Sequence, residues 1–201
     1  MNIYMVRHGQ TDLNLKRVYY GSTDCDINKT GILQAENLRD FFKNIDIDLI
    51  ISSDLKRAYH TAEIIKGNKN IDIIKEKGFR EINFGDWEDR TFKDIMENDT
   101  ENYKIWTENW LDIKFPNGES YMEFANRIEK AFFNVVEKYS HLKNILIVSH
   151  NGTLSSLLCS ALDVGQKSFW RFKIEHGTYT MISVNDNYVV LEKYNSDINF
   201  K

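Results

Sequence analysis

Short apolar stretches alternate with amphipathic ones along most of this chain. Continuous apolar runs predict buried β-strands at 2–7, 48–52, 71–75 and 144–149. Apolar residues at spacings of three and four predict helices at about 29–43, 53–66 and 152–162. A further long helix is expected after the turn at 116–120, with an apolar stripe made of Phe124, Ile128, Phe132, Val135 and Tyr139.

Polar residues mark the ends of these elements. Asn28 suits the start of the helix that begins near Lys29, and Ser53 or Asp54 suits the start of the helix after the second strand. The tripeptide "NDN" (185–187) between two strand-like segments predicts a β-hairpin near the end of the chain.

The alternation of strands with helices predicts a three-layer α/β/α fold. We expect a mostly parallel sheet with helices on both faces, to which the hairpin adds an antiparallel edge. Residues 79–90 look irregular, and residues 91–112 look helical but polar and rich in tryptophan. Because no linker or repeat divides the chain, we expect a single domain over 1–201, with a small helical cap insertion at about 91–120.

Composition narrows the function. The chain has 201 residues and a net charge of -4 without a basic patch, which argues against a nucleic-acid partner. Cys25 and Cys159 lack the spacing of a disulfide framework or a metal site. No signal peptide or membrane span is evident, so we expect no membrane partner and a cytoplasmic location. The oligomeric state, a homodimer included, stays open.

Charged and imidazole side chains follow three of the predicted strands. Arg7 and His8 come after the first strand, Arg57 lies in the first turn of the helix after the second, and His150 follows the strand at 144–149. Since parallel strands end at one edge of a sheet, these groups should meet near helix N-termini and form a pocket for a dianion such as phosphate.

Each of these residues also has a simpler interpretation. Arg57 points away from the apolar stripe of its helix, so that taken alone it would be a solvated surface arginine. His8 or His150 taken alone would more often be structural than catalytic. A metal site is disfavoured because neighbouring arginines would repel a cation and no further ligands accompany the histidines.

A neutral His8 could act as a nucleophile and form a phosphohistidine. The nearby positive charges should lower its pKa, and a backbone carbonyl could fix its tautomer. Asn14 could donate its amide to the phosphate oxygens. A carboxylic acid must protonate the leaving group, and apolar neighbours favour Glu81 over the more solvated Asp86, Glu88 and Asp89.

Four motifs in order, "RHGQTDLN", "SSDLKRAYHTA", "REINFGDWE" and "IVSHNG", resemble the histidine phosphatase superfamily, also called phosphoglycerate mutase-like. The resemblance implies that His8 is the phosphorylated nucleophile and Glu81 the proton donor. It implies that Arg7, Arg57 and His150 bind phosphate with help from Asn14. The loop Gly21, Ser22 and Thr23 matches the substrate-contacting loop of that superfamily, and no metal or organic cofactor is implied.

Within the superfamily, the stretch from "FGDWEDRTF" to "PNGES" and the segments after residue 144 look like the adenosylcobalamin/α-ribazole phosphatases. That similarity implies a small phosphomonoester substrate: α-ribazole 5′-phosphate, or adenosylcobalamin 5′-phosphate, late in cobalamin assembly. Alternatives are a phosphoglycerate mutase, a broad sugar-phosphate phosphatase and a non-catalytic phospholigand-binding module. Two interpretations are open for four aromatic residues: they could face a flat aromatic base of the substrate, or more simply pack within the cap. These residues are Phe84, Trp87, Trp106 and Trp110. His176 could approach the pocket.

Overall fold

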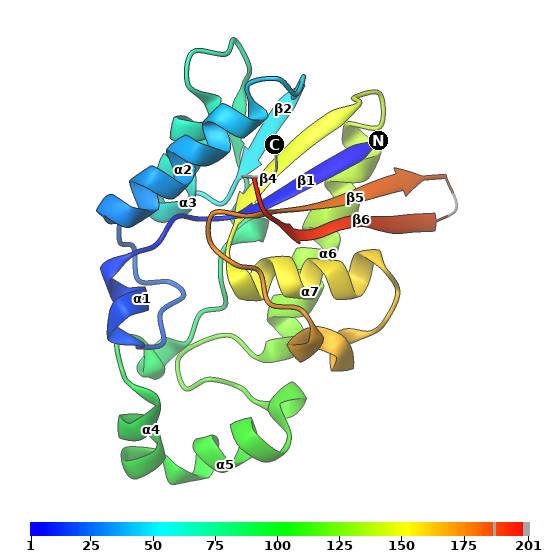
Figure 1. Cartoon of the computed structure of the whole chain (residues 1–201). Helices are drawn as coiled ribbons and strands as arrows, with labels where there is room; N and C mark the ends of the chain where they lie inside the picture. Colours follow the sequence, from blue (N-terminus) through cyan, green and yellow to red (C-terminus); the bar gives the residue numbers. More distant parts are fainter. Residues whose placement is uncertain (187, 199–201) are drawn as a thin grey trace.

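The computed structural model describes residues 1–186 and 188–198 (Figure 1). Its strands are β1 (Asn2–Arg7), β2 (Leu49–Ser52), β3 (Ile73–Lys75), β4 (Asn144–Ser149), β5 (Tyr179–Asn185) and β6 (Tyr188–Ser196). Its α-helices are α1 (Asp12–Lys16), α2 (Lys29–Phe42), α3 (Lys56–Lys66), α4 (Phe92–Asn98), α5 (Thr100–Glu108), α6 (Tyr121–Lys138) and α7 (Asn151–Ala161). Short 3₁₀ turns are η1 (Lys77–Phe79), η2 (Gly85–Trp87), η3 (Trp110–Asp112) and η4 (Gln166–Arg171).

The strands of the described residues form one sheet in the order β3-β2-β4-β1-β5-β6. The first four are parallel, whereas β5 runs antiparallel to β1 and β6 antiparallel to β5. The expected mostly parallel sheet with an antiparallel edge is therefore confirmed. In register, Arg7 lies beside Ser149 and Ser52 beside Val148, so the carboxyl ends of β1, β2 and β4 lie along one edge of the sheet.

Alternating side chains of the strands feed two cores, one on each face. Ile3 and Met5 of β1 pack with the buried stripe of α6 and with α7. Tyr4 and Val6 point the other way and pack with buried residues of α2 and α3. This period-two alternation, matched by helices on both sides (Figure 1), confirms the expected three layers.

The helix starts agree only in part with the expected caps. Asn28 caps α2, because its side chain accepts a hydrogen bond from the Gly31 N–H. The expectation that Ser53 or Asp54 caps α3 is wrong: the helix begins after Leu55, which makes no side-chain cap. Asp54 pairs with Arg80, and the Ser53 hydroxyl lies 2.9 Å from a ring nitrogen of His150.

The segment 91–120 contains α4, α5 and η3, at the bottom of Figure 1 and away from the sheet. The expected helical character is present, but Asp99 separates α4 from α5. The side chain of Asp99 accepts a hydrogen bond from the Trp87 indole at 2.7 Å. The "NDN" turn between β5 and β6 includes residue 187, which lies outside the described residues. In the two described ranges, no helix is long and apolar enough to cross a membrane.

Candidate active site

The segments that follow β1, β2 and β4 at the carboxyl edge of the sheet bring the predicted cations and imidazoles together. The rings of His8 and His150 lie 5.2 Å apart between centroids, and Arg57 donates its Nε–H to His150 Nδ1 at 3.2 Å. Arg57 is fully buried, so the alternative of a solvated surface arginine is wrong. The helical stripe did not show this, because Arg57 points to the strand ends rather than to the sheet.

His8 is held in one tautomer. Its Nδ1 lies 2.8 Å from the carbonyl oxygen of Gly9, which can only accept, so Nδ1 carries the hydrogen and Nε2 keeps its lone pair. Burial, then the positive charges of Arg57 and Arg7, hold the pKa of His8 well below its ordinary value. Near pH 7 the side chain is therefore a neutral imidazole with a free basic nitrogen.

Arg7 presents an unused donor. Its Nη1 donates to the carbonyl of Ile174 at 3.0 Å, whereas its Nε is buried and has no hydrogen-bond partner within the described part of the chain. A buried cationic N–H without an acceptor is costly. An anion bound beside Arg7 would supply the missing acceptor.

Arg57 is oriented by the loop that contains the predicted substrate-binding residues. Its Nη1 donates to the Thr23 carbonyl at 2.8 Å and its Nη2 to the Gly21 carbonyl at 2.7 Å. The guanidinium also lies 4.8 Å from the ring centroid of Tyr20, a residue that the motif analysis did not single out. Each terminal nitrogen of Arg57 carries a second hydrogen besides the one that it donates to a carbonyl.

His150 uses both ring nitrogens within the protein. Nδ1 accepts from Arg57, so Nε2 carries the hydrogen and donates to the Ser53 hydroxyl at 2.9 Å. Burial and the charge of Arg57 hold the pKa of His150 well below its ordinary value. In this arrangement His150 orients Arg57, and its expected direct contact with phosphate stays a prediction.

Glu81 faces the start of α7. One carboxylate oxygen accepts from the Gly152 N–H at 2.9 Å and the other from the Ile82 N–H at 3.1 Å. Burial raises the pKa of Glu81, as its apolar neighbours led us to expect. A carboxyl of this kind keeps its proton to higher pH than a solvated one and can act as a general acid.

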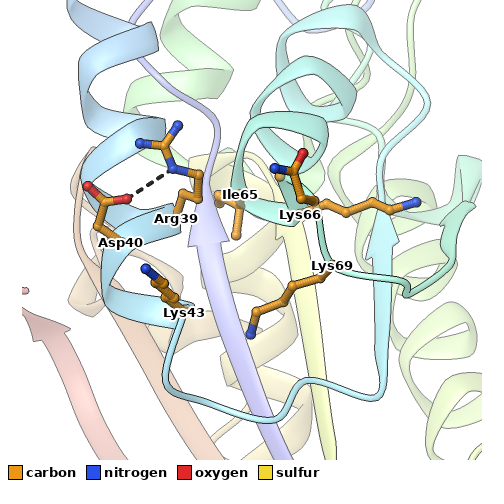
Figure 2. A pocket seen from close by; sticks show the side chains of 8 residues that line it. Arg39, Asp40, Lys43, Ile65, Lys66 and Lys69 are labelled. Atoms are coloured by element: carbon orange, nitrogen blue, oxygen red, sulfur yellow. Dashed lines mark hydrogen bonds and ion pairs between the residues drawn. The ribbon is translucent and has the colours of Figure 1, made fainter.

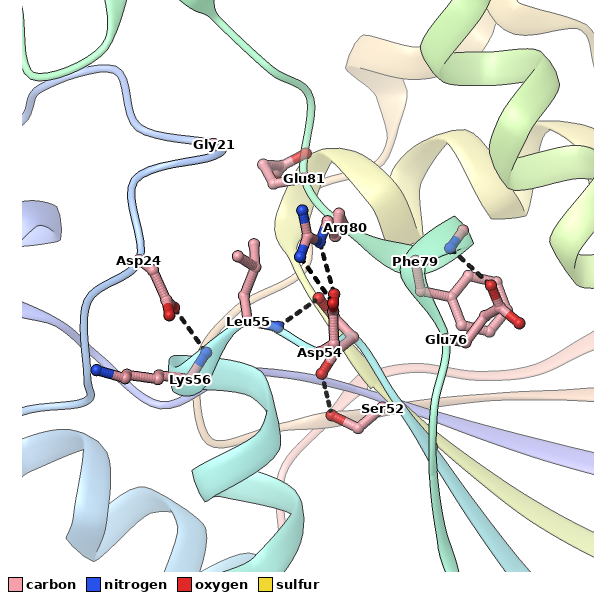
Figure 3. A network of polar contacts seen from close by, with 12 residues as sticks. Gly21, Asp24, Ser52, Asp54, Leu55, Lys56, Glu76, Phe79, Arg80 and Glu81 are labelled. Carbon is pink, nitrogen blue, oxygen red and sulfur yellow. Dashed lines mark hydrogen bonds and ion pairs between the residues drawn. The ribbon is translucent and has the colours of Figure 1, made fainter.

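Two contacts around the start of α3 fix the segments on either side of the site (Figure 3). Arg80, next to Glu81, makes two parallel hydrogen bonds to Asp54 at 2.6 and 2.7 Å. Asp24, just after the 21–23 loop, accepts from the Lys56 N–H at 2.8 Å. Both the acid and the loop that orients Arg57 are thereby tied to the same helix start.

The other predicted binding residues make contacts within the protein. Asn14 lies in α1 and forms a capping box with Thr11: the Thr11 side chain accepts from the Asn14 N–H, and the Asn14 side chain accepts from the Thr11 N–H. The Asn14 side chain therefore contacts the end of the loop after His8. The backbone N–H groups of Gly21, Ser22 and Thr23 all donate to the carboxylate of Glu88. The expectation that Glu88 is a solvated acid is wrong, because it is partly buried and accepts from this loop.

His176 is a third imidazole at the site. Its Nδ1 lies 2.7 Å from the His8 carbonyl oxygen, and the two rings lie 5.5 Å apart between centroids. Burial lowers the pKa of His176 to about 4. β5 begins only at Tyr179, so His176 lies in the loop before that strand, and this loop reaches the site.

A cavity of about 450 Å³ lies beside Glu81. Most of its wall is aromatic or apolar; besides Glu81, the lining comprises Tyr19, Ile82, Phe84, Phe92, Trp106, Tyr121, Phe124, Asn151, Gly152, Phe169 and Trp170. Phe84 and Trp106 thus face the cavity, whereas Trp87 is fully buried and Trp110 is outside the lining. Trp170 also lines the cavity, which the sequence could not reveal because it depends on η4 lying next to α5.

A second hollow of about 510 Å³ lies between the ends of α2 and α3 (Figure 2). It is basic, but Lys69 donates to the carbonyls of Phe42 and Ile45, and Arg39 pairs with Asp40. None of its lining residues is a histidine, cysteine or serine. Across the residues that the structure describes, no group of three or more histidine, cysteine, aspartate or glutamate side chains is arranged to hold a metal ion.

Comparisons with known proteins agree with the motifs. The sequence pattern of the histidine phosphatase superfamily (branch 1) matches residues 3–197. The adenosylcobalamin/alpha-ribazole phosphatase of Escherichia coli strain K12 is 33% identical over 196 residues, which cover 98% of this chain and 96% of the relative. Phosphoserine phosphatase 1 of Hydrogenobacter thermophilus is 31% identical over 195 residues, which cover 97% of this chain and 92% of the relative. The crystal structure of the alpha-ribazole phosphatase from Shigella flexneri matches with a TM-score of 0.94 and 34% identity over 100% of both chains. The chain therefore belongs to the histidine phosphatase superfamily and is a phosphatase.

Proposed function

We propose that this enzyme hydrolyses phosphomonoesters through a phosphohistidine on His8, without a metal ion. The observation that carries the proposal is the environment of His8: a neutral imidazole with a free Nε2, next to the buried Arg57 and the partly buried Arg7. Arg7 offers an Nε–H that is buried and has no partner among the described residues, and each terminal nitrogen of Arg57 carries a second hydrogen besides the one donated to a carbonyl. These donors match the oxygens of a phosphoryl group, whose charge they would stabilise during transfer.

The reaction would proceed in two steps. In the first, His8 Nε2 attacks phosphorus, the bond from phosphorus to the ester oxygen breaks, and Glu81 protonates the departing alkoxide. In the second, ionised Glu81 takes a proton from water, the water oxygen attacks phosphorus, and the bond from phosphorus to Nε2 breaks to restore His8. We assign phosphate contacts also to His150 and Asn14, as the family resemblance implies.

We propose α-ribazole 5′-phosphate, or its adenosylcobalamin counterpart, as the substrate. The cavity beside Glu81 supports this choice, because Phe84, Trp106 and Trp170 line it and could pack against a flat aromatic base at the leaving-group side. Residues 91–120 would then act as a cap, since Phe92 and Trp106 come from that segment. The free cysteines Cys25 and Cys159 support a reducing compartment such as the cytoplasm.

A substrate comparison tests the proposal. With chelator present, kcat/KM for α-ribazole 5′-phosphate should exceed that for ribose 5-phosphate, 3-phosphoglycerate and phosphoserine. Trp106→Leu should lower the preference for α-ribazole 5′-phosphate over ribose 5-phosphate, whereas Phe133→Leu, at an exposed site on α6 outside the cavity lining, should leave it unchanged. Equal turnover of the sugar phosphates, or transfer that requires a bisphosphoglycerate primer, would contradict the substrate assignment.

A further inference from the structure

Glu88 lies at the centre of a dense set of hydrogen bonds. Its Oε1 accepts from the N–H groups of Gly21, Ser22 and Phe84 at 2.9, 2.8 and 3.1 Å. Its Oε2 accepts from the Thr23 N–H at 3.0 Å and from the Thr23 hydroxyl at 2.6 Å. One carboxylate thus gathers three consecutive N–H groups of a loop, which is how backbone N–H groups bind a free anion.

The same loop holds Arg57 from its other side. The carbonyls of Gly21 and Thr23 accept from the two terminal nitrogens of Arg57. The N–H groups of Gly21 and Thr23 donate to Glu88 while their carbonyls accept from Arg57, so Glu88 fixes the loop that aims the guanidinium. The loop is also held very close to the next segment, since a Cβ on Gly21 would lie 1.6 Å from the Ile82 carbonyl oxygen.

Glu88 also reaches the leaving-group side of the site. Its bond to the Phe84 N–H fixes the backbone of a residue that lines the aromatic cavity beside Glu81. Five neutral donors compensate the charge of this partly buried carboxylate. A surface acid would not need that number of partners.

We propose that Glu88 is a positioning residue for phosphoryl transfer: it organises the 21–23 loop so that Arg57 meets the phosphate in the reactive geometry. The inference rests on the proposed function, which makes Arg57 a phosphate ligand. Glu88 itself does not touch the substrate.

Glu88→Gln tests the proposal directly. The glutamine keeps the shape of the side chain but replaces an acceptor oxygen with an NH₂ group that faces the donors of the loop. A displacement of about 1 Å in a positioned group costs on the order of 100-fold in rate. We therefore expect kcat/KM for p-nitrophenyl phosphate to fall by about 10- to 100-fold and inhibition by orthovanadate to weaken in parallel. Asp86→Asn is the matched control, because within the described ranges that carboxylate on the same segment pairs only with the exposed side chain of Asn117; it should leave both quantities unchanged.

A double-mutant cycle separates positioning from a purely structural role. In an Arg57→Ala background, Glu88→Gln should cause little further loss, because the group that Glu88 positions has gone. An equal fold-loss in both backgrounds, or full activity of folded Glu88→Gln, would overturn the proposal. Should Glu88→Gln fail to fold, Thr23→Val, which removes the 2.6 Å hydroxyl donor, carries the same test. If the wild-type protein fails to hydrolyse p-nitrophenyl phosphate, it is the proposed function that is refuted.

Discussion

Replacing Gly152 with alanine should displace the proposed acid without unfolding the protein. A Cβ at this position would lie 2.5 Å from one carboxylate oxygen of Glu81 and 3.2 Å from the other. Since an ordinary contact needs about 3.4 Å, the nearer oxygen must withdraw by roughly 1 Å. The carboxyl group ends a flexible side chain, so it can move where a backbone atom could not.

The expected loss follows from that displacement. A misplacement of about 1 Å at a reacting group costs on the order of 100-fold in rate, and losing a general acid altogether costs about 100- to 10,000-fold. Folding should be preserved, because alanine at a compatible helical position stabilises a protein by about 0.4–1 kcal/mol relative to glycine. Gly152 lies in the first turn of α7 and has no positive φ.

The assay compares Gly152→Ala with Ser160→Ala, a substitution towards the other end of the same helix. We expect kcat for α-ribazole 5′-phosphate, whose alkoxide leaving group needs a proton, to fall by about 100-fold in the first variant and by less than twofold in the second. Thermal unfolding should occur within about 4 °C of the wild type for both. Wild-type kcat in folded Gly152→Ala would refute the role given to Glu81.

Three further predictions follow from the titrating groups. Because the pKa of His8 lies well below its ordinary value, the acid limb of the kcat/KM profile should lie below pH 6.5; a limb at or above that pH would contradict a neutral buried nucleophile. Because the pKa of Glu81 is raised and its protonated form acts first, activity should fall as pH rises through that pKa, and Glu81→Gln should remove this alkaline limb. Burial lowers the pKa of His176 to about 4, so between pH 6.5 and about 4 the unfolded chain binds a proton that the folded one does not. The free energy of unfolding should therefore fall as pH falls through this window, by about 3 kcal/mol from this residue, and denaturant titrations should show that His176→Gln removes this part of the fall.

Much of the fold could be predicted from the sequence because its elements depend on local patterns. The runs at 2–7 and 144–149 correspond to β1 and β4, residue for residue, since both strands are buried on two faces and lack competing polar positions. The start of α3 was misjudged for a physical reason. Ser53 and Asp54 have suitable cap side chains, but these make tertiary contacts with His150 and Arg80, which a local pattern cannot reveal.

In the candidate site too, some features could be predicted from the sequence and others depend on tertiary contacts. The convergence of Arg7, Arg57 and His150 followed from topology, because parallel strands end at one edge. The interior position of Arg57 and the partners of Glu88 could not be predicted, since both depend on how the 21–23 loop folds back over α3. The aromatic cavity also joins residues from α5 and η4, which are far apart in the sequence.

A rapid-quench experiment with labelled α-ribazole 5′-phosphate tests the central claim most directly. A phosphohistidine intermediate predicts an acid-labile, alkali-stable phosphoryl group on the peptide that contains His8, formed faster than phosphate is released and absent in His8→Ala. Turnover at the full rate with no phosphoenzyme at any time, or with the label on another residue, would contradict it.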